Sequence, residues 1–392
     1  MATKKRKKNN KRKAAVKLPL FVVILLIIAA LVLAFLWWKG YLDIWLKPGD
    51  SAGGGTGDTP GGETIVTDDL QIHFLELGNK YTGDCTLIKV GDTEILVDAG
   101  SQRNSAETIG NYLNKYVTDG KIEYVIATHA HDDHISAFVG TKQVKGVFDR
   151  FEFGTIIDFP KTNQKPKTDA GNDTLYKEYC DKRDTLVEGG AIHYTALQCW
   201  NEADGAQKSY QLAEDISLNI LYQKYYEEKS STENNYSVCF LLTQGNNNYL
   251  FTGDLEKSGE VSLVENNRLP HCKLFKAGHH GSATSSNAEL IDIIQPEIVC
   301  VCCCGGYREY KQKEQKDEFP SQDFFDNVIK YTDKIYVTTM YSEKAEGNFE
   351  SLNGNIIVSS NGGEVKVTCS GSNEPFTKSE WYLKYRAGNK AA

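Results

Sequence analysis

Residues 128–134 read THAHDDH and hold three of the eight histidines of the chain together with two carboxylates. Burying so many polar groups without partners would be costly, whereas imidazole and carboxylate are the ligands that zinc and its first-row neighbours prefer. Because alternate residues of an extended segment point the same way, His129 and His131 are expected to hold one cation. Asp133 and His134, which follow a bend, are expected to face a second cation. A solvated polar loop is the competing interpretation.

The amino-terminal residues predict a membrane anchor. Residues 1–17 carry nine Lys or Arg and no acid, and the 21 residues of 18–38 carry no charge. As a transmembrane helix, residues 18–38 would span about 31 Å at about 1.5 Å per residue, which matches a bilayer core. The basic residues predict a cytoplasmic amino terminus, with the rest of the chain outside the cell. A cleaved signal peptide is the alternative, although its apolar core would be shorter.

The remaining sequence predicts one large domain between two flexible segments. Residues 39–64 are Gly-rich and read as a linker, residues 65–370 as the globular domain, and residues 371–392 as a carboxy-terminal tail. After residue 17 the chain holds 35 basic and 52 acidic residues. This excess of acid disfavours nonspecific binding of nucleic acid, although a local basic patch could still exist.

Short apolar strands that end in ligand-type residues recur along the predicted domain. The strand at 122–127 delivers the histidine cluster at its carboxyl end, where open α/β sheets place ligands. Three further predicted strands end in Asp98, in Asp254 and in the pair His279 and His280. One such motif alone is usually a turn, but the repetition indicates a shared site. Other predicted strands lie at 71–77, 85–90, 93–97, 238–242, 334–338, 355–359 and 364–369, and helices at 106–117, 172–186 and 322–331.

These motifs resemble the metallo-β-lactamase fold and, in detail, the hydrolase-like domain of the ComEC competence proteins and their stand-alone relatives. The matching segments are IHFLELGNKYTGDCTLI, EILVDAGS, THAHDDH, ENNYSVCFLL, YLFTGDLE and FKAGHHGSATSSN. The resemblance covers residues 72–287 and continues more loosely to about residue 368. It implies an α/β fold, a four-layer αββα sandwich with one or two metals at one edge of its central sheets.

Carried over residue by residue, the resemblance implies a site for two divalent metal ions, with zinc favoured and manganese as the alternative. The implied ligands are His129, His131, Asp133, His134, Asp254 and His280. Asp254 would bridge the two ions, and His280 is preferred only slightly over His279 as a ligand. The catalytic candidates are Asp133, Asp254 and His279, the last as a proton donor.

Four more residues are candidates for supporting roles. Asp98 and Asp84 are expected to orient ligand imidazoles from behind, although the long loop at 78–84 leaves the role of Asp84 open. The resemblance places Asn235 and Ser237 towards the substrate. A simple polar turn is the competing interpretation for both.

Some positions depart from the family pattern. Many relatives have one more His ligand, but the candidate here, His193, reads as an ordinary strand residue. Phe319-Pro320 stands where relatives often have His-Pro, so a substrate-facing imidazole is missing. The alternation in VCVCCCGG, residues 299–306, predicts a buried strand with free thiols, with a disulfide or a metal site as alternatives.

The predicted function is that of a membrane-anchored, extracytoplasmic hydrolase that acts on phosphodiester or related ester bonds through a metal-bound hydroxide. Its expected partners are the membrane, through residues 18–38, and a small or envelope phosphoester substrate. Nucleic acid is disfavoured by the net charge of the domain. The alternatives are a ComEC-like DNA-processing nuclease and a non-catalytic surface binding protein on the same fold.

Overall fold

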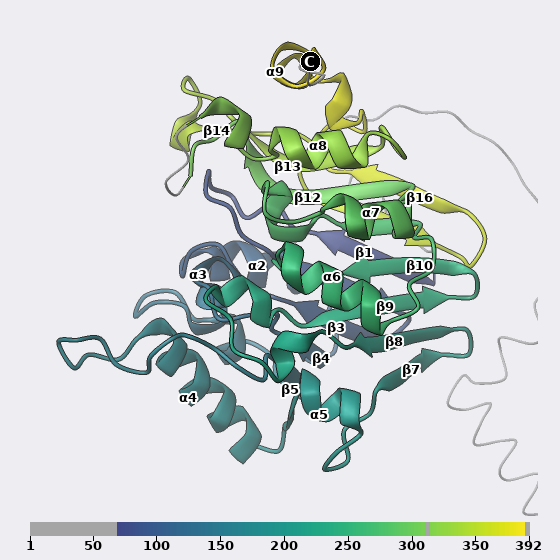
Figure 1. Cartoon of the computed structure of the whole chain (residues 1–392). Helices are drawn as coiled ribbons and strands as arrows, with labels where there is room; N and C mark the ends of the chain where they lie inside the picture. Colours follow the sequence, from purple (N-terminus) through teal and green to yellow (C-terminus); the bar gives the residue numbers. More distant parts are fainter. Residues whose placement is uncertain (1–68, 310–313, 389–392) are drawn as a thin grey trace, which may run out of the picture. The chain divides into compact units, whose positions relative to one another are not determined.

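The computed structural model describes residues 69–309 and 314–388 (Figure 1). The predicted basic segment, membrane helix and linker, residues 1–64, lie outside these described residues. Within the described part of the chain, no helix has both the length and the apolar character needed to cross a membrane.

Two eight-stranded sheets form the centre of the domain. In spatial order, the first sheet contains β16 (Val365–Cys369), β15 (Ile356–Ser360), β1 (Leu70–Phe74), β2 (Thr86–Val90), β3 (Thr93–Val97), β4 (Lys121–Ile126), β5 (Glu152–Asp158) and β6 (Ile192–Thr195). The second contains β14 (Phe349–Ser351), β13 (Ile335–Tyr341), β12 (Ile298–Gly305), β11 (Leu274–Lys276), β10 (Asn247–Phe251), β9 (Cys239–Gln244), β8 (Ile216–Leu221) and β7 (Ser209–Ala213). The first three strands form a meander, because β1, β2 and β3 pair antiparallel.

The two sheets pack face to face. The rings of Phe74 on β1 and Phe251 on β10 stack across the interface with their centroids 6.2 Å apart, and those of Tyr124 and Tyr210 lie 5.4 Å apart. The outer faces carry helices: α2 (Ser105–Leu113), α3 (Asp132–Val139) and α4 (Leu175–Glu188) for the first sheet, and α6 (Lys257–Asn266), α7 (Ala288–Ile294) and α8 (Gln322–Val328) for the second (Figure 1). A short α5 (Ala196–Asn201) follows β6. The mixed α/β prediction is therefore confirmed.

Strand β12 shows how the sequence alternates between two cores. Cys300 and Cys302 face the layer between the sheets, whereas Val299, Val301 and Cys303 pack with the helices of the outer face. All ten cysteines lie in the described residues and are free thiols. The prediction of a buried strand with unpaired cysteines is confirmed.

Helix α3 begins at Asp132, within the THAHDDH stretch. His131 is the extended residue before the helix, and Asp132 and Asp133 form its first turn. Acidic side chains are favourable there because the helix dipole is positive at its amino end. Asp133 and His134 are thus fixed by a helix rather than by a loop.

The predicted tail at 371–392 is wrong for its described part. A 3₁₀ turn (Phe376–Lys378) and helix α9 (Glu380–Tyr385) pack against the outer core of the second sheet. The rings of Phe376 and Tyr382 lie 6.0 and 4.9 Å from that of Phe325 on α8. The sequence interpretation missed this because six residues of helix are too few for an apolar period to stand out.

Arg386, just after α9, ties this carboxy-terminal element to the segment 315–320. Its guanidinium is buried and donates hydrogen bonds to the backbone carbonyls of Pro320 (3.1 Å), Gln315 (3.0 Å) and Glu318 (2.9 Å). It also stacks on Trp381, with 4.4 Å between the guanidinium carbon and the ring centroid. One side chain therefore donates hydrogen bonds to three backbone carbonyl groups.

Replacing Arg386 with lysine is expected to lower the free energy of unfolding by about 2 kcal/mol, because an ammonium cannot reproduce the planar fork of donors and leaves buried carbonyls unpaired. Urea unfolding measures the change. The reverse exchange at the exposed neighbour, Lys384→Arg, is the matched control and should leave stability unchanged. Equal stability of the Arg386→Lys and parent proteins would contradict the assigned contacts.

Candidate metal centre

Four strand ends bring the predicted site residues together. Parallel pairing of β3 with β4 places Asp98 beside residues 128–134, and parallel pairing of β10 with β11 places Asp254 beside His279 and His280. The two halves meet across the sheets, where the backbone N–H of Val238 donates to the carbonyl of Thr128 at 2.9 Å. Residues from both sheets therefore share one edge of the sandwich.

Four of the predicted ligands form one tight cluster, made of Asp133, His134, Asp254 and His280. Their nearest nitrogen and oxygen atoms all lie within 4.8 Å of one another. Nε2 of His134 and Nε2 of His280 lie 3.2 and 3.5 Å from Oδ2 of Asp254, and Nε2 of His280 lies 3.4 Å from Oδ2 of Asp133. This arrangement can hold a divalent cation with mixed nitrogen and oxygen ligands.

The same cluster contains buried polar atoms without a hydrogen-bond partner among the described residues. They are Nε2 of His134, Nε2 of His280 and both carboxylate oxygens of Asp254. Buried groups of this kind are expensive when left unpaired and therefore indicate a missing partner. A divalent cation satisfies all of them at once, so the residues present fit the metal that the donor set implies.

The outer ring nitrogens of the two histidines are already engaged. Nδ1 of His134 lies 2.8 Å from Oδ2 of Asp98, and Nδ1 of His280 lies 2.9 Å from the carbonyl oxygen of Cys302. Asp98 is itself fixed by the backbone N–H and the hydroxyl of Thr128, at 2.7 and 2.8 Å. Each imidazole thus donates outward from Nδ1 and presents an unprotonated Nε2 to the cluster when neutral.

His129 and His131 form the second pair of converging nitrogens. Nε2 of His129 lies 3.0 Å from Nδ1 of His131 and 3.9 Å from Oδ2 of Asp254. On its other side, Nδ1 of His129 lies 3.2 Å from the hydroxyl of Thr128. Asp254, a member of the four-residue cluster, therefore also lies close to this pair.

The electrostatics of the centre reflect three buried carboxylates, Asp84, Asp98 and Asp254, near buried imidazoles. Burial opposes charge on His134, but Asp254 and Asp98 overcome it and raise the pKa of His134 well above its usual value. Burial likewise opposes charge on His280, whose pKa Asp254 and Asp84 raise well above normal. Burial, together with His134, lowers the pKa of His129 well below its usual value. Without metal, protons on two imidazoles thus partly balance the carboxylates.

Three site residues adopt the left-handed backbone conformation that non-glycine residues rarely occupy. The φ angles are 57° at Asp98, 46° at His279 and 53° at His280. Such conformations cost about 1 kcal/mol or more each and persist where the surroundings enforce them, often at functional sites. Gly281 continues the turn with φ of 78°, where an added Cβ would lie 2.9 Å from Cβ of Pro320.

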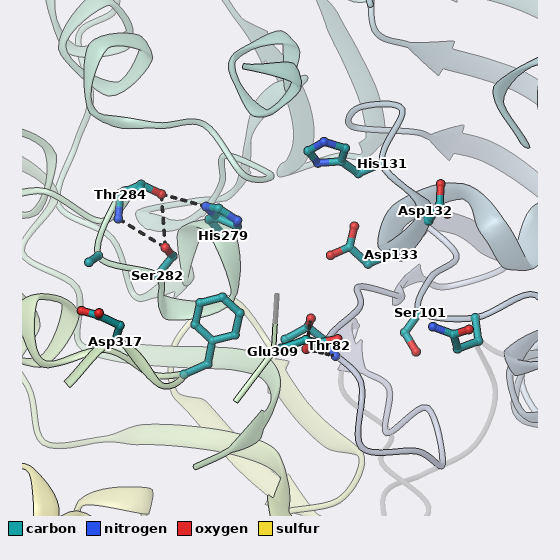
Figure 2. A pocket seen from close by; sticks show the side chains of 13 residues that line it. Thr82, Ser101, His131, Asp132, Asp133, His279, Ser282, Thr284, Glu309 and Asp317 are labelled. Carbon is teal, nitrogen blue, oxygen red and sulfur yellow. Dashed lines mark hydrogen bonds between the residues drawn. The ribbon is translucent and has the colours of Figure 1, made fainter. Parts of the chain in front are cut away.

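A cleft of about 650 Å³ opens above the cluster. Figure 2 shows His131 and Asp133 on one side of it and His279, hydrogen-bonded to Thr284, on the other. Nδ1 of His279 lies 2.8 Å from the Thr284 hydroxyl, Nε2 lies 3.9 Å from Oδ2 of Asp254, and burial lowers the pKa of the ring. The lining residues are Thr82, Ser101, Gln102, His131, Asp132, Asp133, His279, Ser282, Ala283, Thr284, Glu309, Asp317 and Phe319.

Asn235 and Ser237, which were predicted to face the substrate, lie beneath the site. Both are buried, with 3% and 0% exposure, and neither lines the cleft. Ser237 Oγ accepts the backbone N–H of Asp254 at 3.0 Å and lies 3.4 Å from Nδ1 of His129. Asn235 Oδ1 accepts the backbone N–H of Glu256 at 3.2 Å. Their side-chain oxygens accept hydrogen bonds from the backbone, and the Ser237 hydroxyl also lies near His129, a predicted ligand.

Replacing Ser237 with alanine is expected to weaken metal binding by about ten- to hundredfold, because Asp254 and His129 lose the group that orients both. Metal affinity measured by competition with a chromophoric chelator gives the change. Ser209→Ala, at an exposed position of β7, is the matched control. Wild-type affinity in Ser237→Ala would show that the hydroxyl orients neither group.

His193 lies on β6 and does not join the cluster. Its Nε2 is 2.8 Å from Oδ1 of the buried Asp158, which also pairs with Arg183 at 2.8 Å. The sequence interpretation missed Lys276, which is buried beside Asp84. The available signal was a lysine inside the apolar strand LFK, since a buried lysine is nearly always paired.

Comparisons with known proteins agree with this geometry. A model of the metallo-beta-lactamase superfamily matches residues 78–147, which include the THAHDDH stretch. The fold of the domain is of the metallo-β-lactamase type in the part that this model matches. Over 104 residues the chain is 34% identical to the ComE operon protein 3 of Bacillus subtilis (strain 168), which supports the predicted ComEC-like character. That match spans 26% of this chain and 13% of the length of the relative.

Two solved structures are similar to this chain at lower sequence identity. The metallo-beta-lactamase fold protein YhfI from Bacillus subtilis is 14% identical with a TM-score of 0.38, over 72% of this chain and 99% of that chain. A point mutant of CmlA beta-hydroxylase is 12% identical with a TM-score of 0.39, over 70% of this chain and 53% of that chain.

Proposed function

We propose that this metallo-β-lactamase-type domain is a metal-dependent hydrolase of phosphodiester or related ester bonds. The observation that carries the proposal is the convergence of unpartnered buried atoms, Nε2 of His134, Nε2 of His280 and the carboxylate of Asp254. They lie in the same cluster as Asp133, which lines an open cleft. Divalent cations held there would supply Lewis acidity and lower the pKa of a water molecule. Zinc suits the imidazole-rich set, and manganese suits its carboxylates.

The proposed ligands fall into two groups, one for each cation position. His129 and His131 would hold one cation, and Asp133, His134 and His280 the other. Asp254 would serve both, because its Oδ2 lies 3.9 Å from Nε2 of His129 and 3.2 Å from Nε2 of His134. The carboxylates also position a nucleophile by accepting its hydrogen bonds.

His279 is placed to contact the leaving group. Its ring lines the cleft, and the hydrogen bond between Nδ1 and Thr284 fixes the ring orientation while Nε2 faces the side of Asp254. We assign to it the delivery of a proton to the departing oxygen. Burial lowers the pKa of the ring, so the ring is mostly neutral at first. It must gain a proton when the substrate binds or during the reaction before it can deliver one.

The proposed substrates are small or envelope phosphoesters. None of the described residues that line the cleft is Lys or Arg, and Asp132, Glu309 and Asp317 add negative charge to it. A long nucleic acid gains most of its affinity from phosphate contacts with cationic side chains, which this wall does not supply. We further propose that residues 18–38 anchor the chain in the membrane with the catalytic domain outside the cell; protease treatment of intact cells tests this placement.

Metal reconstitution of the full-length chain in mild detergent tests the proposed activity. After chelation, the protein is supplied separately with zinc and manganese and assayed on bis-p-nitrophenyl phosphate, other esters and single-stranded DNA. Metal-dependent turnover is expected on the small esters, with at least about hundredfold loss in His131→Ala and Asp254→Ala. His271→Ala removes an exposed imidazole and should retain activity. Bound metal without metal-dependent turnover on any substrate would favour a binding protein, and turnover confined to DNA would favour a nuclease.

A further inference from the structure

Lys276 brings a permanent positive charge to the back of the metal centre. Its side chain is 4% exposed, and Nζ lies 2.5 Å from Oδ2 of Asp84 and 2.9 Å from the carbonyl oxygen of Ala277. Asp84 is equally buried and reaches the centre with its other oxygen, Oδ1, which lies 3.3 Å from Nδ1 of His280. An ammonium group is therefore connected to a candidate ligand through one carboxylate.

Asp84 belongs to a second group of atoms with the chemistry of a cation site. Ligand atoms of Asp84, Asp98 and His134 lie within 4.8 Å of one another, and all three side chains are buried. A void of about 10 Å³, lined by both carboxylates and by Lys276, lies next to them. Two carboxylates around such a space would attract a metal ion unless another cation neutralised them.

Two atoms of this second group already have partners, whereas Oδ1 of Asp84 has no hydrogen-bond partner among the described residues. Nδ1 of His134 bonds to Asp98 at 2.8 Å, and Oδ2 of Asp84 bonds to the Lys276 ammonium. Asp84 is thus paired through Oδ2 with a cation that belongs to the protein.

We propose that Lys276 is a positioning residue that neutralises Asp84, keeps this carboxylate from ligating a metal, and so confines divalent cations to the side of the centre formed by His129, His134 and His280. This inference rests on the metal binding that the proposed function requires. It gives the buried lysine a role in metal affinity and not only in folding.

A double-mutant cycle on metal affinity, measured on the full-length chain with Mn²⁺, tests the proposal. Asp84→Asn leaves the ammonium uncompensated near the cation and should weaken Mn²⁺ binding at least about tenfold. Lys276→Met leaves the carboxylate uncompensated and should strengthen binding at least about tenfold. The double variant should return to within about threefold of the parent protein, since it lacks both charges.

Lys273→Met is the matched control, because Lys273 pairs with Glu297 at the surface, three residues earlier. It should leave Mn²⁺ affinity unchanged. If Lys276→Met does not fold, Asp84→Asn and the double variant are compared instead, because both lack the Asp84 carboxylate that would be left unpaired. Their difference in Mn²⁺ affinity then tests the role of Lys276. Lys276 has only a structural role if Asp84→Asn weakens Mn²⁺ binding equally with Lys or Met at position 276. A parent protein that binds neither Mn²⁺ nor Zn²⁺ would overturn the proposed function and this inference together, whereas bound metal without hydrolysis would reject the function alone.

Discussion

Replacing Asp254 with asparagine is expected to lower the affinity for divalent metal by at least about 1,000-fold and to abolish hydrolysis. Asp254 is 1% exposed, and its Oδ2 lies within 3.9 Å of ring nitrogens of His129, His134 and His280. Loss of one full charge a few Å from a buried cation is worth about 4 kcal/mol at an effective dielectric constant near 20. Asp254 therefore lies close to histidines of both groups.

The asparagine variant preserves the shape of the side chain, so the experiment separates charge from packing. Metal content is measured by elemental analysis after dialysis, and affinity by chelator competition. Asp169→Asn, at an exposed loop position, is the matched control and should bind metal like the parent protein. If Asp254→Asn kept full metal content at both positions, Asp254 would not bridge two cations.

The sequence predicts the strand ends of this site better than it predicts their surroundings. The strand at 93–97 is found with the predicted bounds, and β10 and β11 end three residues before Asp254 and His279, because short apolar runs between polar turns leave few alternatives. Imidazoles and carboxylates at such ends are conspicuous in the sequence. Their convergence across two sheets depends on long-range pairing, which only the resemblance to a known fold could suggest.

Side chains that support the site from behind were harder to predict. Ser237 and Asn235 lie in a polar segment that looks the same whether it faces solvent or a buried backbone. Lys276 and Asp84 are nearly 200 residues apart, and their pairing depends on how β11 lies against the loop before β2. Local patterns record burial and turn chemistry, whereas a buried ion pair between distant segments leaves no periodic signal.

Removing the metal is expected to make the stability of the protein fall as the pH is raised from about 6.5 to 8.5. Burial opposes charge on His134 and His280, but neighbouring carboxylates raise the pKa of both rings well above normal. A histidine of this kind contributes stability that is fully present below its unfolded pKa of about 6.5 and is lost as the pH rises through its folded pKa. Each ring can remove about 1.4 kcal/mol per pH unit within that window.

The metal-loaded protein should lack this loss, because cations take the place of the two protons and bind more tightly as competing protons leave. The gain in melting temperature on adding metal to chelated protein should therefore increase with pH. Burial raises the pKa of Glu260 to about 7, which also lowers stability as the pH rises, but it does so in both forms and cancels in the difference. His73 and His129, whose folded pKa values are lowered, raise stability slightly near pH 6.5, where the unfolded rings lose their last protons, and add no slope above about pH 7.5.

Thermal unfolding between pH 6.5 and 8.5, with chelator or with added zinc or manganese, measures this linkage. His280→Gln should flatten the pH dependence of the chelated protein, because it removes one of the two titrating rings, whereas His271→Ala at the surface should not. A chelated protein whose melting temperature is constant or rises across this range would show that His134 and His280 carry no protons in the metal-free centre. The unpartnered Nε2 atoms would then require a different occupant, because a neutral ring beside the Asp254 carboxylate leaves both without a bond.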